Sequence, residues 1–117
     1  METFLFNGKK HKVFKVNLFG SEYKVFVMKD QYRLGGMALT VWEINADGEP
    51  EPFGTLTVYM DQFIKDTCAF VKNYSENETW AEDLAVAIGG KPTGITCQSG
   101  YVSVPLYDFS TLDITED

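Results

Sequence analysis

Residues that build metal centres and nucleophilic active sites are scarce in this sequence, which has one histidine and two cysteines among 117 residues. Cys68 and Cys97 do not have C-x-x-C spacing, and a zinc site needs several converging thiolate or imidazole ligands. His11 lies in the lysine-rich stretch 9–12, where we expect a solvated ring rather than the general base of a nucleophile. The sequence therefore predicts no metal, no cofactor, no catalytic residue and two free cysteines.

Long apolar runs and phosphate-binding glycine loops are also missing. No window reaches the ~18 consecutive apolar residues that a membrane span needs, and Glu2 stands where a signal peptide carries a basic residue. Neither Gly35-Gly36 nor Gly89-Gly90 continues into a G-x-x-x-x-G-K-[ST] or G-x-G-x-x-G pattern. These absences predict a cytoplasmic protein with no membrane contact and no nucleotide loop.

Positive charge is limited and unevenly distributed. The formal net charge is −7, which excludes a protein that coats nucleic acid, because neutralising phosphates requires surplus Lys and Arg. Residues 1–40 hold seven Lys and Arg against three Asp and Glu, whereas residues 41–117 hold three against fourteen. The chain is therefore basic at its start and strongly acidic in its remainder.

Apolar residues are abundant, at 44% of the chain with 15% aromatic, so a substantial core is available. Gly20-Ser21 predicts the break of one antiparallel hairpin, and Asp47-Gly48 predicts the turn of a second. Pro50 and Pro52 are expected to keep residues 45–52 outside the sheet. Residues alternate as in strands in the segments 12–19, 22–28 and 53–60, whereas the segment 37–44 is apolar on both faces and is expected to be a central strand.

One helix is predicted after these strands, because Trp80, Leu84 and Ile88 recur every four residues. Gly89-Gly90 ends the helix. Its start has two candidate capping boxes, Ser75 with Glu78 or Thr79 with Glu82. With further strands at 70–74 and 101–106, the order predicts a single α+β domain over residues 1–117: an antiparallel sheet of five to six strands with one helix on one face, and frayed ends at 1–11 and 110–117.

Acidic residues gather in two clusters. Such clusters are either solvated faces that aid solubility or a surface that docks on a basic protein in place of nucleic acid. Glu78 and Glu82 also raise the possibility of paired catalytic carboxylates, but the helix macrodipole already favours acids in a first turn. We therefore predict that the protein is not an enzyme and binds its partner through Glu43, Asp47, Glu49, Glu51, Glu76, Glu78, Glu82 and Asp83.

The basic start supports an alternative, a module that contacts nucleic acid. Aromatic and basic residues on a sheet bind single strands by stacking and by phosphate contact. Phe26 is the expected stacking residue, and the expected phosphate contacts are Lys9, Lys10, Lys12, Lys15 and Lys24.

Several short blocks in this order resemble an uncharacterised family of small proteins carried by plasmids, integrative elements and phages of Firmicutes and other gut bacteria. The resemblance covers roughly residues 13–109 and implies a mobile-element accessory protein without known catalytic residues. It rests on Lys15-Val-Asn-Leu-Phe-Gly20, Phe53-Gly-Thr-Leu-Thr-Val58, Trp80-Ala-Glu-Asp-Leu84, Lys91-Pro-Thr-Gly94, Ser99-Gly-Tyr101 and Pro105-Leu-Tyr-Asp-Phe109.

Small acidic proteins of mobile elements often inhibit host defences, and the resemblance extends this expectation to the present chain. Its expected partner is a CRISPR or restriction nuclease. The expected mechanism is protein binding of the anti-CRISPR or antirestriction kind.

Overall fold

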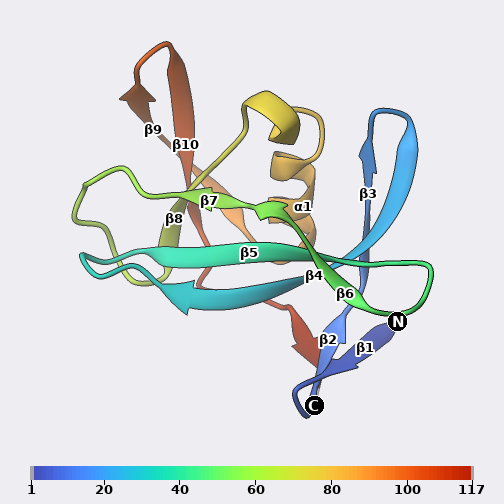
Figure 1. Ribbon diagram of the computed structural model, residues 1–117. Coiled ribbons are helices and arrows are strands. Elements are labelled where there is room, and N and C mark those ends of the chain that lie inside the picture. The colour runs from blue at the N-terminus through green and yellow to red at the C-terminus, as the bar shows by residue number, and fades with distance from the viewer. Residues whose placement is uncertain (1, 117) are drawn as a thin grey trace.

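The computed structural model describes residues 2–116 and all their side chains except that of Ser99. Its backbone is 54% strand and 9% helical. The strands form three antiparallel sheets of three or four strands each (Figure 1). The predicted α+β fold with one sheet of five to six strands is therefore wrong. Residue periodicity identified most of the strands, but it carries no information about which strands pair.

The first sheet has the order β3-β4-β5-β6. The predicted hairpin at its start is confirmed, with Leu18 opposite Ser21. Its turn residues are Phe19 and Gly20, one position earlier than expected, and both have the positive φ angles, 52° and 80°, of a type I′ turn. The strands are β3 (Phe14–Leu18), β4 (Ser21–Gln31), β5 (Met37–Ile44) and β6 (Pro50–Thr55).

Prolines are part of this sheet, against our expectation. Pro50 pairs with Ile44 and Pro52 with Trp42 in β6, which is an edge strand. An edge strand tolerates proline because the backbone groups on its outer side have no neighbouring strand, so a missing N–H there costs no hydrogen bond of the sheet. The Asn45 side chain closes the β5–β6 turn by accepting hydrogen bonds from two backbone N–H groups of the turn, both at 2.9 Å.

The second sheet has the order β7-β8-β10-β9. The chain enters it at Leu56, whose N–H donates to Leu39 in the first sheet and whose carbonyl accepts from Lys72, beside the second. The predicted strand 53–60 is thus divided between two sheets. The members of the second sheet are β7 (Thr57–Val58), β8 (Cys68–Val71), β9 (Lys91–Ser99) and β10 (Val102–Asp108).

Both ends of the chain meet in a third sheet, the terminal sheet, although we predicted that residues 1–11 and 110–117 are frayed. Asn7 and Gly8 form the turn of its hairpin, again with positive φ angles. The backbone N–H of Lys12 also donates to the carbonyl of Ile114 at 2.9 Å. The order is β1-β2-β11, with β1 (Thr3–Phe6), β2 (Lys9–Lys12) and β11 (Thr115–Glu116).

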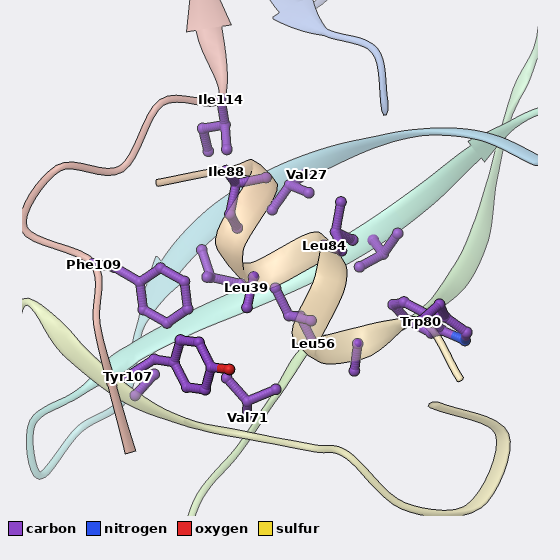
Figure 2. Close-up of a cluster of buried hydrophobic side chains, with 14 of the residues drawn as sticks. Val27, Leu39, Leu56, Val71, Trp80, Leu84, Ile88, Tyr107, Phe109 and Ile114 are labelled. Carbon is purple, nitrogen blue, oxygen red and sulfur yellow. The ribbon is translucent and has the colours of Figure 1, made fainter. Parts of the chain in front are cut away.

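A short 3₁₀-helix, η1 (Ser75–Asn77), precedes the α-helix, α1 (Ala81–Ala87). The predicted apolar face is confirmed: Trp80, Leu84 and Ile88 are buried among side chains of the first two sheets (Figure 2). Neither capping box forms, because no side chain caps η1 or α1. The Trp80 indole instead donates to the Glu76 carbonyl at 2.8 Å, which fixes the tryptophan in the core as the helix begins.

Candidate partner-binding surface

The helical segment lies between two projecting hairpins. In Figure 1 the β3–β4 and β9–β10 hairpins extend to the same side of the molecule, with η1 and α1 between them. On one flank, Glu82 of α1 accepts a hydrogen bond from the Tyr107 hydroxyl of β10 at 2.7 Å. On the other flank, Asp83 lines a groove of about 340 Å³ between α1 and β3. The outward side of the segment exposes Glu78, Glu82, Asp83 and Val86, which we call the helix face.

Two of the four predicted helical acids are engaged within the protein. The Lys72 ammonium lies 2.9 Å from the Glu76 carboxylate, and this hydrogen bond holds the pKa of Glu76 below its usual value. Glu82 is bound by Tyr107 and, at 3.3 Å, by the Asn73 amide. Burial and the hydrogen bond to Glu82 together raise the pKa of Tyr107 to about 12. Glu76 and Glu82 therefore hold the segment in place as well as adding charge.

The other two acids of the segment, Glu78 and Asp83, are exposed, and their carboxylates make no hydrogen bond or ion pair with any residue that the structure describes. Their charges are available to a partner. The carboxylate of Glu82, which was considered with Glu78 as an alternative catalytic pair, is engaged in two hydrogen bonds within the protein.

Aromatic side chains mark the tips of both flanking hairpins, a feature that we did not predict. Phe19 is 89% exposed in the turn between β3 and β4, and Tyr101 is fully exposed in the turn between β9 and β10. Each lies beside a glycine with positive φ, Gly20 and Gly100. The sequence signal was an aromatic residue beside a turn glycine, where no core is within reach.

The acidic cluster of the β5–β6 hairpin lies elsewhere. Its turn is at one end of the first sheet in Figure 1, away from η1 and α1. Glu43 lies directly opposite Glu51, whose carboxylate accepts a hydrogen bond from the Asn45 amide at 3.0 Å. Asp47 and Glu49 are exposed on the turn. The eight predicted contact residues therefore form two separate acidic surfaces rather than one.

The predicted stacking residue of the nucleic-acid alternative is not accessible. Phe26 is 0% exposed, and the rings of Phe4 and His11 both lie 5.1 Å from it. Three of the five predicted phosphate-contact lysines are paired: Lys12 with Asp113 at 2.7 Å, Lys15 with Glu22 at 3.9 Å and Lys24 with Glu2 at 3.2 Å. The N-terminal strands therefore present no aromatic platform at Phe26.

Cys68 and Cys97 are free, as predicted. Within residues 2–116, no three His, Cys, Asp or Glu side chains gather closely enough to hold a metal ion. None of the described helices has the length and apolar character to cross a membrane. Comparisons with protein-family models, curated proteins and solved structures find none that matches this chain.

Proposed function

We propose that this protein acts by binding a basic surface of another protein through its helix face. The observation that carries the proposal is the position of two unpaired carboxylates, Glu78 and Asp83, between two hairpins with exposed aromatic tips. Exposed aromatic side chains are frequent anchors in protein interfaces, and acidic groups steer a basic partner into place. Charge and anchoring groups thus occur together on one side of the molecule.

The partner that fits this chemistry is a protein with a basic groove for nucleic acid. Such a groove is lined with Lys and Arg, and an acidic protein competes for it without any catalysis. Following the family resemblance, we propose a host-defence nuclease of the CRISPR or restriction class as the target and a mobile element as the origin. The protein is then a cytoplasmic inhibitor and not an enzyme.

Cleavage assays with purified nucleases test this proposal. Increasing amounts of the protein are added to a panel of CRISPR and restriction nucleases, and the concentration that halves plasmid cleavage is measured. We expect inhibition of at least one nuclease, weakened by added salt because the contact is between exposed charges. If no member of a panel covering both classes is inhibited, the assignment to defence nucleases is wrong.

A matched pair of variants tests the surface. Glu78→Lys with Asp83→Lys reverses two charges on the helix face, whereas Asp47→Lys with Glu49→Lys makes the same change in net charge on the β5–β6 turn. We expect the concentration that halves plasmid cleavage to be at least about tenfold higher for the first variant, which corresponds to a loss of about 1.4 kcal/mol in binding free energy. The second variant should inhibit like the wild type. Equal effects of the two variants would show that only net charge matters and that the helix face is not the contact.

A further inference from the structure

A groove of about 660 Å³ lies where the terminal sheet meets the rest of the protein. Residues of the terminal sheet, including Thr115 of β11, line it together with residues of β4 and of the segment 109–114. Its apolar floor consists of the half-buried side chains of Phe6, Met28 and Leu112 together with the buried core residues Val27, Met37, Phe109 and Ile114. The volume is in the range of small-molecule sites, roughly 300–1,000 Å³. We call it the lysine groove.

Unpaired cations line this groove in a protein of net charge −7. No described carboxylate lies within ion-pair distance of Lys9 or Lys29. Asp113 is the one acid among the lining residues, and Lys12 neutralises it at 2.7 Å. The groove thus carries surplus positive charge, and it adds hydroxyl groups from Thr67, Ser110 and Thr115.

His11 adds an unsatisfied polar atom to the same wall. Its side chain lines the groove, the residue is only 5% exposed, and its Nδ1 has no hydrogen-bond partner among the described residues. Burial lowers the pKa of His11, the nearby Lys9 lowers it further, and the Phe6 carbonyl opposes both. Buried polar atoms are nearly always hydrogen-bonded, so we expect a water molecule or a polar group of a ligand at this atom.

Lysines and an apolar floor select different parts of one ligand. Two free ammonium groups favour an anionic head, whereas the half-buried apolar side chains of the floor favour a hydrocarbon or aromatic body. An inorganic anion satisfies only the first requirement, and a neutral apolar molecule satisfies only the second.

We propose that the lysine groove binds a small organic anion with an apolar body, its head at Lys9 and Lys29 and its body against Phe6, Met28 and Leu112. This inference goes beyond the proposed function and is independent of it. The terminal sheet that forms the groove lies at the opposite end of the molecule from η1 in Figure 1.

Fluorescence of anilinonaphthalene sulfonate tests the proposal, because this probe joins an apolar ring system to one anionic group. We expect saturable, one-site binding to the folded protein. Phenylnaphthylamine, which has the same rings without the sulfonate, is expected to bind at least about tenfold more weakly. Equal affinity for the two probes would overturn the anionic requirement.

Two lysine variants locate the site. Lys9→Gln with Lys29→Gln removes both cations of the groove, whereas Lys65→Gln with Lys91→Gln removes two exposed lysines that do not line it. We expect the first variant to bind the sulfonate at least about tenfold more weakly and the second to bind it like the wild type. Equal binding of the probe by the wild type and both variants would exclude the lysine groove as its binding site. Matched near-ultraviolet circular dichroism ensures that the probe reports on folded protein.

Competition separates the possible head groups. Dodecanoate and dodecyl phosphate share the same chain with different anionic heads, and dodecanol is their neutral counterpart. We expect at least one of the two anions to displace the probe from the wild type, and dodecanol to displace it at least about tenfold less well. Displacement by neither anion, or by dodecanol equally, would refute the proposed ligand class. Inhibition of nucleases by the helix face does not enter any of these measurements.

Discussion

The two ends of the molecule carry surfaces of opposite charge that are joined to the core in different ways. At the helix end, the free acids Glu78 and Asp83 belong to a segment held by a buried tryptophan and by the Tyr107–Glu82 hydrogen bond. At the other end, the unpaired Lys9 lies on the β1–β2 hairpin. This hairpin is attached to the rest of the protein by pairing with the two-residue strand β11 and by side chains such as Phe4, which packs on Phe26. The helix end therefore depends on a buried indole in the main core, whereas the terminal end depends on a two-residue strand and on aromatic rings packed around the buried Phe26.

The largest expected effect is at the helix end. Trp80→Ala removes a buried indole that packs edge-on against Phe53 at 5.2 Å and donates to the Glu76 carbonyl. We expect a loss of about 3–5 kcal/mol in the free energy of unfolding, measured by urea denaturation. Val86→Ala, on the exposed side of the same helix, is the control and should change stability by less than about 0.5 kcal/mol. Similarly small changes in the free energy of unfolding for both substitutions would mean that Trp80 does not stabilise the helix end.

Alkaline pH should weaken the helix end next. An unfolded tyrosine loses its proton near pH 10, whereas the pKa of Tyr107 is raised to about 12 in the fold. Above pH 10 the unfolded chain therefore binds fewer protons than the folded one, so stability is complete below pH 10 and falls as the pH rises toward 12. We expect a decrease on the order of 2 kcal/mol across this window.

Tyr107→Phe isolates this contribution from that of the other tyrosines. Its unfolding free energy should fall less between pH 10 and 12 than that of the wild type, because it lacks the group that titrates. Parallel pH curves for the two proteins would show that burial and the hydrogen bond to Glu82 do not raise the pKa of Tyr107.

Acidic pH should weaken the terminal end, with a smaller effect because the Phe6 carbonyl partly offsets the burial of His11. The pKa of His11 is lowered below its ordinary value of 6.5. The unfolded chain therefore takes up a proton first as the pH falls, and stability decreases below about pH 6.5 until the folded ring also titrates. His11→Phe keeps an aromatic ring against Phe26 and should remove this acid dependence in thermal unfolding. If the variant loses stability below pH 6.5 as the wild type does, groups other than His11 cause the acid dependence.

The sequence predicted the helix end better than the terminal end. Trp80, Leu84 and Ile88 have the period of one buried helix face, and this local pattern survives in the structure. Each turn of such a helix buries its apolar residue on the same face, so the spacing of the apolar residues alone was sufficient to predict that face. The hydrogen bond between Tyr107 and Glu82 joins distant segments, and no spacing predicts it.

The terminal sheet was missed for two different reasons. Asn7-Gly8 is a strong signal for a two-residue hairpin turn, and it could have identified β1 and β2. The strand β11 has only Thr115 and Glu116, which is too short for any periodicity. Its pairing with β2 joins residues from opposite ends of the chain, and Thr115 of β11 is one of the residues that line the lysine groove.

The smallest expected effect is at the contact that joins the two termini. Lys12 and Asp113 lie 2.7 Å apart, but their side chains are 20% and 60% exposed, so water screens much of the attraction. A double-mutant cycle with Lys12→Met and Asp113→Asn should give a coupling energy of roughly 0.2–1 kcal/mol that decreases in high salt. A coupling above about 2 kcal/mol, insensitive to salt, would mean that the pair is effectively buried. The terminal end would then be anchored by one strong polar contact, and the contrast with the helix end would fail.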